Sequence, residues 1–150
     1  MSIERIFYPE HNMVLSMFYG KLTHHELTQH VIDMNREYEK CTHLFELANC
    51  RYLTDISTLN SQGLTLAASL EKDQPRTFES KGAIVVDSDV VYGLARVFAT
   101  IAAESRIDSR VYRNLDDAIV WLEVGALSQE IKGHDQRIEA IMRTNAAPTA

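Results

Sequence analysis

The sequence has little of what marks the specialised classes of protein. Its 150 residues include two cysteines and three prolines, and no apolar run approaches the ~20 residues that a membrane-spanning helix needs. Two cysteines without a signal-peptide pattern predict a reduced, cytoplasmic protein with no disulfide framework. The net charge is 15 − 21 = −6, with no local Lys/Arg cluster, which argues against nucleic acid as a partner.

Catalytic signatures are also missing from the sequence. There is no Gly-x-Ser-x-Gly elbow, Cys-x-x-Cys pair, phosphate loop or dinucleotide fingerprint. His24, His25 and His30 fall in one expected helix, but no two of them have the i, i+4 spacing that lets histidines share a metal ion. We interpret them as part of a solvated helix face, and we expect no metal, no cofactor and no enzymatic activity.

The N-terminal part of the chain predicts a hairpin followed by a helix. Residues 3–8 and 13–19 are short strand-like segments joined by a turn, so they must pair antiparallel. Thr23 and Glu26 have the spacing of a capping box, in which each side chain satisfies a free backbone N–H. Apolar residues then recur at helical spacing, which predicts a helix over residues 23–39.

Strands and helices alternate in the rest of the chain. The strands are expected at 43–50, 83–86 and 107–113. One helix is expected to begin at Ser57, Asn60 or Ser61 and to end at Gln74-Pro75. The next is expected to run from the Asp87-Ser88-Asp89 cap to about residue 104. A further helix is expected to begin at Asn114.

This order predicts an α/β fold with a mixed, largely parallel sheet of about five strands that opens with an antiparallel hairpin. We assign residues 1–124 to this domain. Residues 125–143 form a weaker amphipathic pattern, interrupted by Gly133, and are expected to add a C-terminal helix or helix pair. Residues 144–150 are expected to be a disordered tail. Whether the added segment packs on its own sheet or across a dimer stays open.

A general rule of open α/β sheets places a candidate site. Ligands collect beyond the carboxyl ends of parallel strands, where helix N-termini present free N–H groups. The residues expected at this edge, which a ligand or partner would contact, are Arg51, Ser57, Ser61, Ser88, Asp89 and Asn114. Capping is the ordinary role of such serines and of Asn114.

The third expected helix carries a second candidate surface. Tyr92 and Arg96 lie off its apolar stripe, and Gly93 between them has no side chain. This combination allows a close neighbour, which is either another helix of the chain or a second subunit. A homodimer interface is therefore one expectation for this face.

Three segments together resemble the SpoIIAA-like family, which is related in fold to STAS domains and to CRAL-TRIO lipid-binding domains. They are the hairpin leading to residues 19–23, the strand with the motif at residues 93–98, and residues 111–122. The resemblance covers approximately residues 3–123. In STAS domains that antagonise anti-sigma factors, a serine in Asp-Ser-Ser-Gly is phosphorylated. The nearest match here, residues 60–63, maps that position onto Ser61, with Asn60 and Gln62 replacing the aspartate and the second serine.

The resemblance implies a non-enzymatic regulatory or protein-interaction module, with a partner protein or a second copy of the chain as its target. A pocket for a small apolar or lipid-like ligand, by analogy with the CRAL-TRIO relatives, is the alternative. An enzyme is the least favoured reading. The sequence leaves the ligand, the partner and the oligomeric state open.

Overall fold

The computed structural model describes residues 3–41, 43–70, 80–103 and 107–146. The first half of the chain forms β1 (Ile3–Tyr8), the 3₁₀ turn η1 (Pro9–His11), β2 (Met13–Lys21), α1 (His24–Glu37), β3 (Phe45–Asp55) and α2 (Ser61–Ser69). The second half forms β4 (Lys81–Val85), α3 (Asp89–Ala102), β5 (Asp108–Tyr112), α4 (Leu115–Trp121), the 3₁₀ turn η4 (Gly125–Leu127) and α5 (Ser128–Ala146). No helix among the described residues is both long and apolar enough to cross a membrane.

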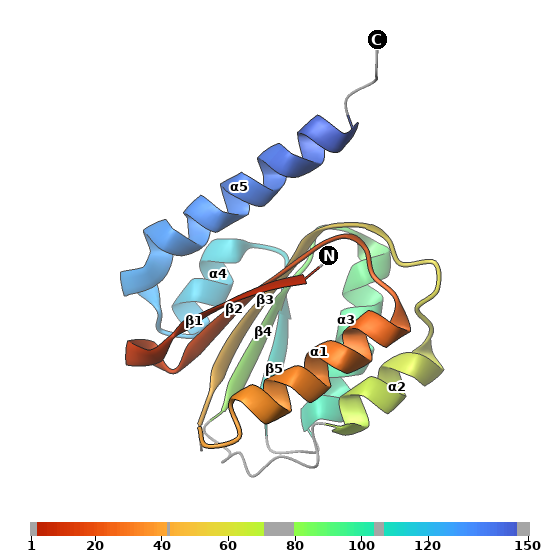
Figure 1. Cartoon of the computed structure of the whole chain (residues 1–150), viewed down its shortest axis with the longest axis horizontal. Helices are drawn as coiled ribbons and strands as arrows, with labels where there is room; N and C mark the ends of the chain where they lie inside the picture. The colour runs from red at the N-terminus through yellow and green to blue at the C-terminus, as the bar shows by residue number, and fades with distance from the viewer. Residues whose placement is uncertain (1–2, 42, 71–79, 104–106, 147–150) are drawn as a thin grey trace.

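The five strands form one sheet whose spatial order follows the chain, β1-β2-β3-β4-β5 (Figure 1). β1 pairs antiparallel with β2, and the remaining neighbours pair parallel. The predicted mixed, largely parallel sheet with an opening hairpin is therefore confirmed.

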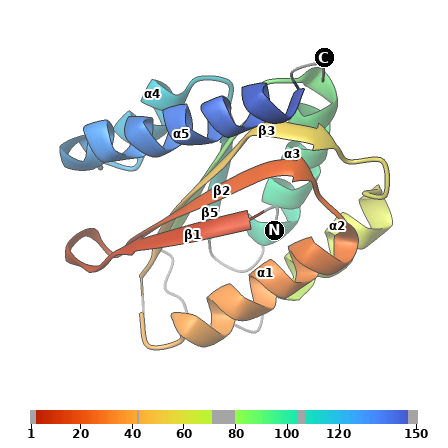
Figure 2. The same ribbon diagram turned by 45° about the horizontal axis from the view of Figure 1, so that its top comes forward.

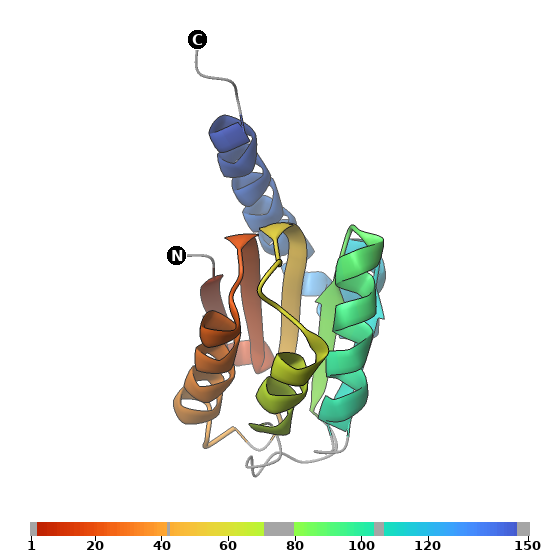
Figure 3. The same cartoon turned by 90° about the vertical axis from the view of Figure 1, so that its right-hand side faces the viewer.

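The connection pattern divides the helices between the two faces of the sheet. Each parallel crossover steps to the next strand in the same direction, and right-handed crossovers that all advance one way place their helices on one face. α1, α2 and α3 therefore lie side by side on one face (Figure 3). α4 and α5 follow the last strand and cover the opposite face (Figure 2).

Alternating residues of the central strands contribute to the hydrophobic cores on the two faces of the sheet. Met13, Leu15 and Met17 of β2 are fully buried and belong to the core under α4 and α5. The intervening positions face the α1–α3 side, where Phe18 joins a second core with Ala48 and Leu64. A period of two is what a strand with two buried faces requires.

The α1 start confirms its predicted capping box. The Thr23 hydroxyl accepts a hydrogen bond from the Glu26 backbone N–H at 3.2 Å, and the Glu26 carboxylate accepts one from the Thr23 N–H at 3.2 Å. Asn60 is the N-cap of α2, which decides among the three alternatives. Ser88 and Asn114 cap α3 and α4 as expected. The predicted stop at Gln74-Pro75 lies outside the described residues.

The C-terminal segment forms a single helix, which is one of the two expected arrangements. α5 passes through Gly133 and extends to residue 146, so residues 144–146 are helical where a disordered tail was expected. Residues 147–150 lie outside the described part. Ile131 and Ile138 of α5 are fully buried in the chain's own core, so the helix packs on its own sheet. This burial stabilises a helix that Gly133 alone would weaken by about 1 kcal/mol.

Candidate functional site

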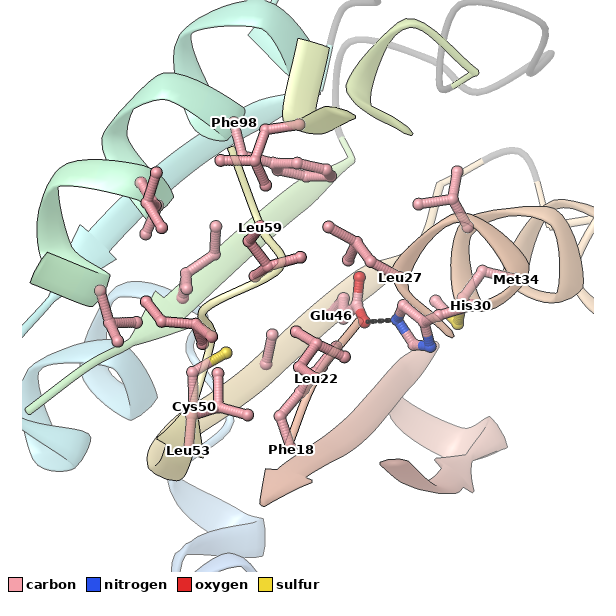
Figure 4. Close-up of a pocket in the computed structure, with 18 residues that line it drawn as sticks. Phe18, Leu22, Leu27, His30, Met34, Glu46, Cys50, Leu53, Leu59 and Phe98 are labelled. Atoms are coloured by element: carbon pink, nitrogen blue, oxygen red, sulfur yellow. Dashed lines mark hydrogen bonds and ion pairs between the residues drawn. The ribbon is translucent and has the colours of Figure 1, made fainter. Parts of the chain in front are cut away.

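An apolar cavity lies between the sheet and the three helices α1, α2 and α3 (Figure 4). Its volume is about 100 Å³. The lining side chains come from β2, β3, β4, all three helices and the loops after β2 and β3. They are Phe18, Leu22, Leu27, His30, Val31, Met34, Glu46, Ala48, Cys50, Leu53, Ile56, Leu59, Leu64, Ile84, Val91, Leu94, Ala95 and Phe98.

A polar cluster interrupts this apolar lining at the α1 side. The Ser16 hydroxyl donates to Glu46 Oε2 at 2.7 Å, and His30 Nε2 lies 2.9 Å from the same oxygen. On the other edge of the imidazole ring, Arg5 Nη1 lies 3.2 Å from His30 Nδ1. The side chain of His30 is 5% exposed and that of Glu46 is 24% exposed. A charged group therefore lines an otherwise apolar space.

The strand alternation explains why these polar side chains meet. Ser16 takes an inward position on the α1–α3 face of β2, and it pairs in register with Ala48 beside Glu46 on β3. His30 falls on the same helical stripe as Leu27 and Met34, so α1 turns it toward the sheet. The interpretation of His30 as part of a solvated face is wrong, because the apolar stripe of the helix buries it. His25, five residues earlier on another face of the helix, is exposed.

The Cys50 thiol also lines the cavity, and burial raises its pKa well above the ordinary range. The negative charge of Glu46 raises it further. The thiol therefore stays protonated at neutral pH and lacks the thiolate that a cysteine nucleophile needs.

A second buried polar cluster anchors α5 to the opposite face of the sheet. Asp135 accepts hydrogen bonds from Asn49 Nδ2 at 2.7 Å, from Arg51 Nη1 at 3.2 and 3.1 Å, and from the Tyr52 hydroxyl at 3.0 Å. Asn49 is fully buried and Asp135 is 7% exposed. Burial, reinforced by Asp135, raises the pKa of Tyr52 to about 12, so its phenol keeps the proton that it donates.

A bulge in β3 makes this second cluster possible. The register with β2 changes between the pairs Met17–Asn49 and Tyr19–Tyr52, so β3 has one extra residue there. The Arg51 backbone N–H donates to Asn49 Oδ1 at 3.2 Å across the bulge. Consecutive residues of a regular strand point to opposite faces of the sheet. The bulge changes this locally, so Arg51 and Tyr52 can both contact Asp135.

The structure separates the residues predicted at the strand-end edge. Arg51 binds Asp135 under α5. Ser57 donates its hydroxyl to Asp55 at 2.7 Å in a tight turn. Asp89 pairs with Arg113 at 2.7 Å close to the caps Ser88 and Asn114. Ser88, Asp89 and Asn114 therefore lie near one another, with the side-chain oxygens of Ser88 and Asn114 used as helix caps, and binding of a ligand or partner at this edge stays a prediction.

Ser61 is the first residue of α2 and is exposed. The capping role that sequence reasoning allowed it belongs to Asn60, whose side chain accepts from Gly63 N–H at 2.9 Å. The His24 ring packs against Gly63, where an added Cβ would lie 1.9 Å from a ring atom. His24 Nε2 also accepts from the Asn60 N–H at 3.1 Å. Phosphorylation of Ser61 stays a prediction.

Half-buried Tyr92 and exposed Arg96 lie together on α3 beside β5. Arg96 Nη1 donates to the Tyr92 hydroxyl at 3.3 Å, and the Arg113 guanidinium lies 4.4 Å from the centre of the Tyr92 ring. Gly93 faces open space, with no described atom within 4 Å of an added Cβ. The expected close helix neighbour at Gly93 is therefore not found within the described chain, and the alternative of a second subunit stays a prediction.

Sequence reasoning did not select Ser16, His30 and Glu46 as a group. A signal was present, because Ser16 and Glu46 each occupy an inward position in a strand-like segment and His30 occupies one in an apolar helical stripe. Across the residues that the structure describes, no group of three His, Cys, Asp or Glu side chains is arranged to hold a metal ion.

The sheet order, the hairpin and the helix placement define an α/β protein with a SpoIIAA-like fold. A solved structure with this fold, an uncharacterised protein of the DUF3478 family from Shewanella loihica PV-4, superposes with a TM-score of 0.53. The match has 17% sequence identity and covers 80% of this chain and 91% of the other. Comparison with models of protein families and with curated protein sequences gives no match. At this identity the similarity shows the fold alone.

Proposed function

We propose that the protein is a non-enzymatic binding module that holds a small apolar molecule in the cavity beneath α1, α2 and α3. The observation that carries this proposal is the cavity itself, which is lined almost entirely by apolar side chains and has a polar cluster at one side. Ligand pockets typically combine an apolar lining with a few polar groups that orient the ligand. The geometry thus favours the ligand-binding alternative over the interaction module that the sequence favoured.

The non-enzymatic part of the proposal is supported by the chemistry of the lining. Ser16 is fully buried and is not among the side chains that line the cavity, so its hydroxyl is not placed to attack a molecule held there. The Cys50 thiol is held in its protonated form by burial. Both cysteines are free thiols, which fits the expected reducing, cytoplasmic setting.

The volume limits the size of the ligand. A cavity of 150 Å³ in another protein accommodates benzene, with its six carbons. A volume of about 100 Å³ therefore suits roughly four or five carbons in this conformation. A long lipid chain would require the helices to move apart, so we propose a small ring or a short branched chain as the buried part of the ligand.

Replacing Ala95 with leucine should fill the cavity and weaken ligand binding. Burying the five carbons of cyclopentane gains about 4 kcal/mol at ~0.8 kcal/mol per methylene, which corresponds to a Kd of about 1 mM. In Ala95→Leu this affinity should fall at least tenfold, while the free energy of unfolding stays equal or rises by about 0.5–2 kcal/mol. The methyl NMR signal of Met34, which also lines the cavity, reports binding.

Thr100→Leu is the matched control, because Thr100 lies on the same helix at an exposed position. It should leave cyclopentane binding unchanged. A wild-type protein that shows no Met34 shift, together with an Ala95→Leu variant destabilised by about 1–3 kcal/mol, would contradict the proposal. That cost is typical of adding atoms to a core that is already filled.

A second candidate function, protein interaction, is supported by one edge of the sheet. Among the described strands β5 pairs with β4 alone, which leaves its other side open to a further strand. Cations lie on aromatic rings near this edge: Arg96 and Arg113 on Tyr92, and Arg110 of β5 together with Lys81 of the neighbouring β4 on Trp121. We propose an acidic segment in extended conformation as the partner, because it complements these charges and can add to β5.

The double variant Arg96→Glu/Arg113→Glu tests this second function. A fluorescent peptide of alternating glutamate and valine should bind the wild-type protein, and the variant should weaken binding at least tenfold. Arg143→Glu, at an exposed position on α5, is the control and should have no effect. Equal binding of a lysine–valine peptide would exclude charge recognition at this edge.

A further inference from the structure

The sheet has an open edge at each end of its strand order. Among the described strands, β1 pairs with β2 alone, just as β5 pairs with β4 alone. The two edge strands are similar in length, with six residues in β1 and five in β5. An open strand edge is a template for pairing with another chain. The molecule therefore carries two such templates, on opposite sides of the sheet.

A groove runs beside each of these strands. The groove beside β5 has a volume of about 500 Å³, and small side chains make up much of its wall, among them Ala99, Thr100, Ala103 and Ser109. The groove beside β1 has a volume of about 820 Å³ and lies between α1 and α5, as Figure 2 shows for the strand itself. Each groove leaves room for the side chains of an added strand.

The two edges carry opposite excess charges. In the part of the chain that the structure describes, Arg96 of α3 contacts the hydroxyl and the ring of Tyr92 and forms no ion pair. Beside β1, Asp33 and Glu37 of α1 share a single cation, Arg5, at 3.7 and 3.3 Å. The β5 edge thus has an arginine without a carboxylate, and the β1 edge has one carboxylate more than it has cations to pair with the two.

The topology places these charges so that they can meet between two molecules. α1 and α3 take the two outer positions on the same face of the sheet, with α2 between them (Figure 3). A second copy set beside the first in the same orientation therefore brings its α1 next to α3. Each of these helices has 14 residues, and Asp33 and Arg96 lie near the middle of theirs.

The strand directions suit the same arrangement. β1 runs antiparallel to β2, whereas β2, β3, β4 and β5 are all parallel to one another. The β1 strand of a copy in the same orientation would therefore pair antiparallel with β5, which is the commoner kind of strand pairing.

We infer that the acidic segment bound at β5 is the β1 edge of a second copy of this chain, so that copies join head to tail in one continuous sheet. The inference rests on the second proposed function and names its partner. Symmetric pairing of two β5 edges would bring Arg96 toward its own copy, and pairing of two β1 edges would do the same for Asp33 and Glu37. Like charges placed opposite one another disfavour both. A head-to-tail contact closes into a ring or continues as a filament.

Sedimentation velocity of the full chain over a wide range of protein concentrations tests this contact. The mean sedimentation coefficient should rise with concentration, and it should rise less at high salt, which screens the exposed charges. Arg96→Glu and Glu37→Lys should each weaken the association about tenfold. The double variant Arg96→Glu/Glu37→Lys exchanges the two charges within one chain and should recover most of the loss. Arg143→Glu, at an exposed position on α5, is the control and should associate as the wild-type protein does.

The peptide of alternating glutamate and valine separates this inference from the function on which it rests. It should compete for the β5 edge and shift the wild-type protein toward the monomer. If the peptide binds while the protein stays monomeric at every concentration, the inference is overturned and the second proposed function stands. If neither the peptide nor a second copy binds, both are overturned. Association that the peptide does not reverse, or that the charge exchange does not restore, also overturns the head-to-tail contact.

Discussion

Replacing Asp135 with alanine is expected to lower the free energy of unfolding by about 3–5 kcal/mol, because it leaves buried partners without their acceptor. Asn49 is fully buried, and the side chain of Arg51 is 31% exposed. Both direct donors at Asp135, together with the Tyr52 hydroxyl. In the variant, if α5 remains packed on the sheet, these donors are buried without an acceptor.

Urea denaturation of the wild-type protein and the variant measures this loss. Lys132→Ala is the matched control on the same helix, since it removes an exposed ion pair with Asp116. Exposed pairs contribute about 0–1 kcal/mol, so the control should change little. A loss below about 1 kcal/mol in Asp135→Ala would show that Ile131 and Ile138 hold α5 without help from the polar cluster.

The second large effect is expected at His30. The variant His30→Leu keeps an apolar side chain on the α1 stripe but removes the donor to Glu46. Breaking a buried pair by removing one partner costs about 3–5 kcal/mol. Glu46 keeps 24% of its side chain exposed, so the loss should fall near 2–3 kcal/mol. Thermal and urea unfolding should both report it.

His25→Leu is the control for this variant, because His25 is exposed on the same helix and should contribute less than about 0.5 kcal/mol. The triple variant Ser16→Ala/His30→Leu/Glu46→Leu provides a further comparison. Replacing buried ion pairs with well-packed apolar residues is often neutral or stabilising. Arg5 would lose its contact with His30 and would keep its ion pairs with Asp33 and Glu37. We therefore expect the triple variant to recover most of the stability that His30→Leu loses. A triple variant less stable than His30→Leu would show that the polar cluster stabilises the fold. That result would contradict the view that the cluster is present for function.

The fold could be predicted from the sequence to the extent that local signals agreed with the tertiary structure. The capping box at Thr23 and the caps Ser88 and Asn114 are local, and each lies where expected. β3 extends to Asp55, beyond the predicted end at residue 50, because β2 continues to Lys21 and supplies a partner for it. Tertiary pairing set that boundary, and local propensity could not reveal it.

The two polar clusters could not be predicted, because each depends on packing between distant segments. Ser16, His30 and Glu46 come from three elements, and their meeting requires the register of β2 on β3 together with the rotation of α1. The contact of Arg51 with Asp135 also requires the bulge in β3, which no sequence pattern predicted. The signal in the sequence was a serine or glutamate inside an apolar strand pattern. Which partner such a side chain contacts depends on the helix that packs over that strand.

The sequential order of the strands has a consequence for the order in which the molecule folds. Each βα unit packs beside the one that precedes it in the chain, so the sheet can grow from β1 toward β5 as synthesis proceeds, with short loops to close at every step. α5 is the exception, because Asp135 binds Asn49 86 residues earlier and Arg137 binds Glu4 133 residues earlier. We therefore expect α5 to dock last, and the loss in Asp135→Ala to appear mainly as faster unfolding. Until that docking, the part of this hydrophobic sheet face that α5 covers stays open to solvent.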